Sequence, residues 1–413
     1  MENKDNFLIK RESEIRFPFL VLYYMWDNLY IYDIRKEKTM KSKFIRYRKP
    51  LINTYKKLTQ DKELNIVYFG GSVTAGYGST DKEKYSWRAL SAKWFREHFP
   101  EANIRDVNTA IGESGTFLGV YRLERDILSQ APDLLFIEYA INDFFFGSSM
   151  EVAALQYETI VREVKARFPQ CDIVTLITDC RETAEADELY GAAMGHERIA
   201  RAYQIPTIYV GKALVDSISD LCDEEWKKYF IDIVHPTDDG YLAYYKCVEE
   251  FLQQSLIVSP PDVHGVEEAE LIPVQSEHLL DGNRVYQNCK QDMLKESLGF
   301  YYSEDVYLAL PETPYVGYIY AENDEAEFTY RFHGTELAML SNFKKESKIL
   351  YSVDGGEWIE KHGSTHNPTV IVQHLESGEH VIQLCPVFTE NSPKQMKIAV
   401  IFTRDEALET RRL

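Results

Sequence analysis

Length, composition and charge set the first limits on this chain. Its 413 residues exceed what one hydrophobic core usually supports, so we expect two or three domains. With 45% hydrophobic and 27% charged residues, the composition is that of a globular protein and excludes disordered, collagen-like and coiled-coil chains. The formal charge of −20 argues against a protein that binds nucleic-acid phosphates along a groove.

The charge is unevenly distributed along the chain. Residues 1–60 contain 14 Lys and Arg but 7 Asp and Glu, so this leader carries +7 and the remainder carries −27. The leader is also aromatic, and we expect two strands and a basic helix within residues 1–61. A basic leader on an acidic body is a candidate contact with a neighbouring subunit, which would make the protein a homo-oligomer.

Neither membrane insertion nor export is indicated by the sequence. No stretch approaches the roughly 20 apolar residues that span a bilayer. The apolar run 17–26 is not followed by a small-residue cleavage site. The six cysteines form no C-x-x-C pair, and we expect them to be mostly buried thiols. We therefore expect a cytoplasmic protein that has no membrane partner and no cofactor.

Residues 62–257 alternate short apolar runs with amphipathic stretches. The apolar runs, which we predict to be strands, cover residues 64–69, 103–107, 133–140, 172–178 and 206–210. Helical spacing follows each of them, as Leu118, Tyr121 and Leu123 illustrate after the second. This alternation predicts a three-layer α/β/α domain with a parallel sheet covered on both faces.

Beyond residue 258 the helical patterns give way to short β-branched and aromatic segments. Asp354-Gly355-Gly356 and Ser377-Gly378-Glu379 look like hairpin turns. We predict that residues 258–413 form an antiparallel β-sandwich. Its aromatic side chains could stack on sugars or pack within the sheets; they include Tyr301, Tyr302, Tyr315, Tyr318 and Trp358.

A serine stands on a glycine-flanked turn after the first predicted strand, in the stretch Gly70-Gly71-Ser72-Val73-Thr74-Ala75-Gly76. Ligands bind at this edge of open parallel sheets. The loop is not an ATP-binding P-loop, because Tyr77-Gly78 replaces the required Lys-Ser/Thr pair. It is not a G-x-S-x-G nucleophile elbow either, because Thr74 occupies the last position.

Three further segments place polar groups at the same edge. Residues 108–115, after the second strand, offer backbone N–H groups in a conformation that glycine permits. The third strand ends in Asn142-Asp143. Asp232 precedes His235 by three residues, so its carboxylate can hold imidazole Nδ1 while Nε2 faces Ser72. The other nine histidines lack a carboxylate at this spacing and are interpreted as surface or core residues.

These four blocks, in this order, resemble the SGNH, or GDSL-like, hydrolases. The resemblance covers roughly residues 62–256 and implies a flavodoxin-like sheet. The local sequences around Ser72 and Asn142 are more similar to those of the carbohydrate-esterase-like members than to those of the lipases. An additional β-sandwich domain of the jelly-roll kind is consistent with such a member.

The resemblance implies that Ser72 is the nucleophile, His235 the base and Asp232 the residue that orients the imidazole. It also implies an oxyanion hole made by the Ser72 amide, the Gly112 amide and the Asn142 side chain. Many family members carry glycine where Glu113 stands, so either Gly112 or Glu113 supplies the second amide.

A divalent-metal site is the alternative use of the segment that carries His235. Asp232, His235, Asp238 and Asp239 could hold a cation, but Asp238-Asp239-Gly240 also reads as a helix start. With a single histidine in the cluster, we predict no metal.

The expected activity is hydrolysis of O-acyl esters, acetyl above all, on a saccharide or another small molecule. An acyltransferase that uses the same three residues and a non-catalytic glycan-binding or assembly protein remain the alternatives.

Overall fold

The computed structural model describes residues 42–186, 188–218, 222–263, 273–276, 280, 282–307, 315–343, 347–363, 368–390 and 392–406. The chain divides after Lys43, and both domains described below lie in the second unit, Phe44–Leu413. The strands predicted within residues 1–41 lie outside the described residues. The predicted basic helix appears as α2 (Ile52–Lys56) and continues as one π-helical turn, Lys57–Asp61.

A six-stranded sheet forms the centre of the first domain, in the order β1-β6-β5-β4-β2-β3. Its strands are β1 (Ile45–Arg46), β2 (Glu63–Gly70), β3 (Asn103–Asn108), β4 (Leu134–Glu138), β5 (Asp172–Ile177) and β6 (Thr207–Tyr209). The five predicted strands are therefore confirmed as β2 to β6, and they run parallel, whereas β1 runs antiparallel to β6. Every residue of β4 and β5 is buried, as expected of strands covered on both faces.

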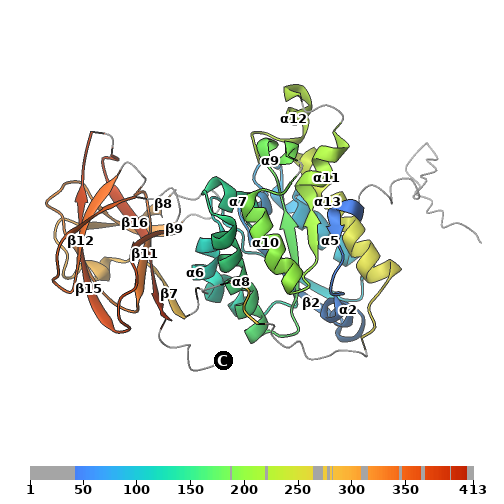
Figure 1. Ribbon diagram of the computed structural model, residues 1–413, viewed down its shortest axis with the longest axis horizontal. Helices are drawn as coiled ribbons and strands as arrows, with labels where there is room; N and C mark the ends of the chain where they lie inside the picture. The colour runs from blue at the N-terminus through green and yellow to red at the C-terminus, as the bar shows by residue number, and fades with distance from the viewer. Residues whose placement is uncertain are drawn as a thin grey trace, which may run out of the picture. The chain divides into compact units, whose positions relative to one another are not determined.

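Helices cover both faces of this sheet (Figure 1). Residues of α5 (Trp87–His98), α11 (Val210–Ser217) and α13 (Asp238–Gln253) belong to one buried cluster. Residues of α6 (Thr116–Asp126), α8 (Met150–Arg167) and α10 (Gly191–Ala202) belong to the other. The shorter helices are α3 (Ser72–Ala75), α4 (Lys82–Tyr85), α7 (Ala140–Phe145), α9 (Arg181–Glu185) and α12 (Asp223–Tyr229). The predicted three-layer α/β/α domain is confirmed.

The strand order identifies the edge at which ligands bind. After β2 the chain adds β3 on one side and β4 on the other, so the order of the strands reverses at β2. In open α/β sheets the crevice outside the carboxyl ends of the strands at such a reversal is the usual binding site. The residue that lies at this point is Ser72, which starts α3 directly after β2 and Gly71.

The second domain consists of two antiparallel sheets packed on one buried cluster. The four-stranded sheet contains β10 (Phe328–His333), β15 (Glu379–Val387), β12 (Lys348–Val353) and β13 (Ile359–His362). The other sheet contains β14 (Thr369–Val372), β11 (Glu336–Ser341), β16 (Met396–Asp405), β9 (Tyr315–Ala321), β8 (Tyr301–Tyr307) and β7 (Asn283–Asn288). The predicted β-sandwich is confirmed.

One of the two predicted hairpin turns is confirmed and the other is wrong. Asp354 and Gly355 both have positive φ and connect the paired strands β12 and β13. Ser377 and Gly378 lie between β14 and β15, which belong to different sheets. Their turn signal is real, but it marks a crossover between the sheets and not a hairpin.

The two domains share a buried apolar cluster. It joins Ile111, Leu118 and Tyr121, near and on α6, to the face of β11 and β16 that carries Leu340 and Phe402. Arg284 donates a hydrogen bond of 2.5 Å to Glu163 on α8 beside this contact. The sandwich therefore packs against the helix that follows the loop of residues 108–115.

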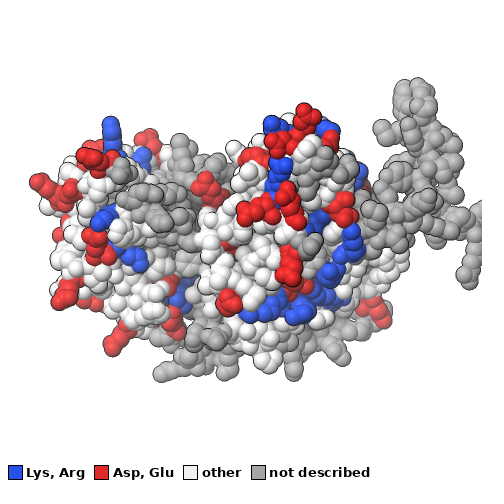
Figure 2. Space-filling view, turned by 45° about the horizontal axis from the view of Figure 1, so that its top comes forward, with Lys and Arg blue, Asp and Glu red and all other residues white. Residues whose placement is uncertain are grey.

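The surface, the cysteines and the helices add three observations. Figure 2 shows Lys and Arg side chains lying among Asp and Glu side chains on the face it presents. Four cysteines are buried (Cys171, Cys180, Cys247 and Cys289), Cys385 is half-buried and Cys222 is exposed. Among the described residues, no helix combines the length and the apolar character needed to cross a membrane.

Candidate active site

Ser72 lies on a tight turn that only glycine permits. A Cβ on Gly70 would collide with Thr74 Oγ1 and the carbonyl oxygen of Glu138. A Cβ on Gly71 would lie 2.7 Å from Asn142 Nδ2, so the Asn142 amide packs directly against the residue before Ser72. The two glycines thus let β2 turn sharply into α3 and let Asn142 approach the serine.

The segment that carries His235 folds back as its spacing predicted. The Ser72 hydroxyl lies 2.7 Å from His235 Nε2, and His235 Nδ1 lies 2.7 Å from Asp232 Oδ2. The backbone amides of Val234 and His235 donate to the other oxygen, Asp232 Oδ1, at 2.9 and 2.8 Å. Because Nδ1–H donates to the carboxylate, Nε2 is free to accept the serine proton.

The Asp232 carboxylate is held in its charged form. Burial by itself would raise its pKa, but the amides of Val234 and His235 and the imidazole of His235 together lower the pKa below the ordinary value. An ionised carboxylate at Nδ1 fixes the tautomer and the orientation of the imidazole. Ser72, His235 and Asp232 are therefore arranged as a nucleophile, a base and an orienting acid would be.

The loop after β3 differs from the expected conformation in one respect. Within residues 108–115 the positive φ, 53°, belongs to Glu113 and not to a glycine. Glycine adopts this conformation most easily, so the backbone at Glu113 is in a conformation that few side chains favour. Glu113 is exposed, whereas Gly112 and Ser114 are buried. The carboxylate of Glu113 therefore lies toward solvent, and both amide candidates, Gly112 and Glu113, remain in the turn that precedes α6.

Asp143, the residue after Asn142, is buried and ties this segment to α6 and α10. Asp143 Oδ1 accepts the amide hydrogen of Thr116 at 2.8 Å, and Oδ2 accepts its hydroxyl at 2.7 Å. His196 Nε2, on α10, lies 2.9 Å from the same Oδ2, and both side chains are buried. Sequence reasoning placed Asp143 at the correct edge and His196 among core or surface residues, and the structure puts His196 in the core. No spacing signal could have paired them, because 53 residues separate the two.

Besides Asp143, the carboxyl group of Glu138 at the end of β4 is buried near α3. Burial raises the pKa of Glu138 to about 7, although the hydroxyls of Thr178 and Thr74 donate hydrogen bonds of 2.8 Å to it. Thr74 belongs to α3, so Glu138 ties the helix of Ser72 to the sheet.

Asp238, one of the four residues considered as metal ligands, binds the turn after α3 instead. Asp238 accepts hydrogen bonds from the Ser79 hydroxyl at 2.7 Å and the Thr80 amide at 3.0 Å, across the turn that follows α3. The N-cap of α13 is Thr237, whose hydroxyl accepts the amide hydrogen of Gly240. The segment therefore starts a helix, as the second interpretation predicted, with Thr237 and not an aspartate as its cap.

The sandwich borders this site on one side. Tyr307, at the end of β8, is buried, and burial together with the nearby Glu113 carboxylate raises its pKa. Of the predicted sugar-stacking candidates, Tyr318 is buried while Tyr301 and Trp358 are exposed. Tyr318 is therefore part of the packing, and the side chain of Tyr315 lies outside the described residues.

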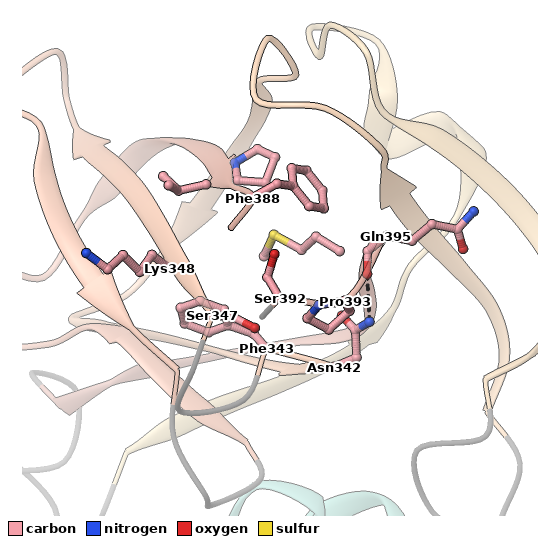
Figure 3. Close-up of a pocket in the computed structure, with 11 residues that line it drawn as sticks. Asn342, Phe343, Ser347, Lys348, Phe388, Ser392, Pro393 and Gln395 are labelled. Atoms are coloured by element: carbon pink, nitrogen blue, oxygen red, sulfur yellow. Dashed lines mark hydrogen bonds between the residues drawn. The ribbon is translucent and has the colours of Figure 1, made fainter. Parts of the chain in front are cut away.

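A separate small pocket lies at one end of the sandwich, between the ends of β11 and β16 in one sheet and of β12 and β15 in the other (Figure 3). Phe343, Pro386, Phe388 and Met396 give it an apolar lining, and Asn342, Ser347, Lys348 and Ser392 add polar groups. It contains none of the predicted site residues.

The family model of the GDSL-like lipases and acylhydrolases matches residues 68–243. This stretch runs from the end of β2 into α13 and contains every predicted site residue. The domain belongs to this family. No curated protein sequence matches the chain.

Two solved structures resemble both domains together. One is a two-domain esterase active on acetylated mannans, co-crystallised with mannopentaose; it is 20% identical, has a TM-score of 0.69 and is matched over 89% of this chain and 98% of that chain. A second structure of a two-domain esterase active on acetylated mannans is 19% identical, with a TM-score of 0.67 and the same coverage. At this identity the likeness establishes the two-domain fold, namely an α/β/α domain followed by a β-sandwich.

Proposed function

We propose that the protein is a serine esterase that removes O-acyl groups, acetyl above all, from a saccharide. The observation that carries the proposal is the hydrogen-bonded series Ser72–His235–Asp232 at the point where the strand order reverses. The proposed saccharide substrate is supported by the two-domain fold, which the chain shares with an esterase active on acetylated mannans.

In the proposed reaction, Ser72 Oγ attacks the ester carbonyl carbon while its proton passes to His235 Nε2. The carbonyl oxygen becomes an oxyanion that the Ser72 amide, the amide of Gly112 or Glu113, and Asn142 Nδ2 stabilise. The bond to the alcohol then breaks, and the alcohol oxygen takes the proton from His235. Water repeats these steps on the acyl-enzyme, which releases the acid and restores Ser72.

Hydrolysis of p-nitrophenyl acetate, labelling by a fluorophosphonate and acetate release from acetylated oligosaccharides test the proposal together. Ser72→Ala should abolish labelling and lower kcat/KM by roughly 10⁵-fold, whereas the exposed Ser129→Ala should match the unmodified protein. If Ser72→Ala hydrolysed the ester at the original rate, the nucleophile would be wrong. Product formed only when an acceptor sugar is added would indicate an acyltransferase. Saccharide binding without labelling would indicate a non-catalytic protein.

A further inference from the structure

Tyr77 holds an unusual position beside the imidazole of the proposed base. Its ring lies edge-on to that of His235, with centroids 4.6 Å apart and planes at 71°. Despite this contact the side chain is 40% exposed. An aromatic ring that touches a proposed base and also faces solvent has surface left for a substrate.

The backbone around Tyr77 is fixed on both sides. Gly76 and Gly78 have φ of 94° and 95°, a conformation that side chains rarely adopt. The Tyr77 amide donates to the Ser72 carbonyl oxygen at 3.0 Å, and the Tyr77 carbonyl oxygen accepts the Tyr241 hydroxyl at 2.7 Å. The turn therefore sets the ring of Tyr77 against His235 instead of leaving it on a loose loop.

Ile231 extends this apolar surface from the other chain segment. Its Cδ1 approaches the position that a Cβ on Gly78 would occupy, at 3.3 Å, and its amide donates to the His235 carbonyl oxygen at 2.9 Å. The side chain is 53% exposed. Tyr77 and Ile231, which approaches the neighbouring Gly78, therefore offer exposed apolar surface beside His235.

The chemistry of the proposed reaction assigns an occupant to this surface. Because His235 returns its proton to the leaving alcohol, the alcohol oxygen must come within hydrogen-bond reach of Nε2. The carbon skeleton of the alcohol then lies over whatever surrounds the imidazole. We infer that Tyr77, with Ile231, is the platform that binds the alcohol part of the ester, a sugar ring whose C–H face packs on the tyrosine. This inference rests on the proposed function and names a residue that selects its substrate.

Tyr77 could bind the alcohol part of the ester, or it could only hold His235 in position. Comparing two acetate esters that differ only in the alcohol distinguishes these roles. Methyl acetate has a one-carbon alcohol that is too small to cover Tyr77, whereas an acetylated monosaccharide covers it. Tyr77→Ala should lower kcat/KM for the acetylated sugar at least about tenfold more than for methyl acetate, chiefly through KM. Tyr77→Phe, which keeps the ring, should lose less than about threefold on the sugar ester.

Ile231→Ala provides a second, milder variant in case Tyr77→Ala fails to fold. It should lower kcat/KM for the sugar ester about threefold more than for methyl acetate. Ile257→Ala is the matched control, since Ile257 is 41% exposed in the turn after α13 and should not change either value. Equal losses on the two esters in both variants would overturn the inference while leaving the esterase intact. If the unmodified protein neither takes up a fluorophosphonate at Ser72 nor hydrolyses methyl acetate, the proposed function itself fails.

Discussion

Among the described residues of the α/β domain, two Asp–His pairs have nearly the same nitrogen–oxygen distance but differ in solvent exposure. In one, Asp232 and His235 lie 2.7 Å apart with side chains 42% and 19% exposed, and His235 Nε2 faces Ser72 Oγ. In the other, Asp143 and His196 lie 2.9 Å apart with side chains 2% and 0% exposed, and His196 stacks on Tyr157. The same two side chains thus adjoin the proposed nucleophile in one place and are packed in the core in the other.

The ring nitrogen that points away from the carboxylate accounts for this difference. In His235 this nitrogen faces the Ser72 hydroxyl, from which it can accept a proton. The other nitrogen of His196, Nδ1, is buried and has no hydrogen-bond partner among the described residues. We therefore expect activity to depend on the first pair and stability on the second.

Removal of the imidazole in the exposed pair should have the largest effect. His235→Ala leaves Ser72 without a base, and we expect kcat/KM for p-nitrophenyl acetate to fall by roughly 10⁵-fold. His362→Ala, at an exposed histidine of the sandwich, serves as the control and should keep the full rate. A loss of less than tenfold in His235→Ala would remove this pair from the mechanism.

The next largest effect is expected for Asp232→Asn. The amide cannot stabilise an imidazolium, so kcat/KM should fall by roughly 10³-fold, whereas the free energy of unfolding should change by only about 1 kcal/mol. Steady-state kinetics and urea unfolding measure the two quantities. Asp239→Asn, an exposed aspartate of the same segment, is the control. A large loss of stability with little loss of rate would reverse the assignment of the two pairs.

Asp143→Asn should show the opposite pattern. It removes a buried carboxylate that accepts two hydrogen bonds from Thr116 and one from His196, so we expect the free energy of unfolding to fall by about 3 kcal/mol. Urea unfolding at pH 7 measures this loss, again with Asp239→Asn as control. If stability were unchanged, the buried pair would not anchor Asn142 and the start of α6.

A third Asp–His pair, in the sandwich, should have the smallest effect. His380 Nδ1 lies 2.7 Å from Asp354 Oδ2 and Nε2 lies 2.8 Å from the Glu376 carbonyl oxygen. Burial opposes the charge, but Asp354 and this carbonyl raise the pKa of His380, while His380 lowers the pKa of Asp354. Because Asp354 is half exposed, solvent screens the pair, and we expect it to contribute about 0.5 kcal/mol.

The sign of its pH dependence follows from these directions. A raised histidine pKa stabilises the folded state fully below the ordinary imidazole pKa of about 6.5, and the contribution disappears as the pH rises through the folded-state value. The lowered pKa of Asp354 confines the contribution to pH values above about 4. The destabilisation by His380→Ala, measured by urea unfolding, should therefore be larger at pH 5.5 than at pH 9. A difference that grows toward pH 9 would contradict it.

The sequence alone determined the features that depend on local pattern. The apolar runs of β2 to β6 and the amphipathic stretches between them predicted the parallel sheet, because burial on both faces requires such runs. Ser72 after β2 and the three-residue spacing of Asp232 and His235 predicted the geometry at the sheet edge, because short spacings constrain where side chains can reach. The Asp354-Gly355 hairpin was likewise visible in its turn residues.

The tertiary structure decided what depends on residues that are distant in the chain. It paired Asp143 with His196 across 53 residues and brought Ile231 next to Gly78. It also showed that Ser377-Gly378 links two sheets, because a turn signal fixes a local bend and not the partner of the next strand. The positive φ of Glu113 is sustained by the surrounding fold, against the residue's own preference. Local sequence patterns were thus sufficient to predict Ser72 and His235 as the candidate nucleophile and base. The residues that support and surround these two side chains depend on long-range packing.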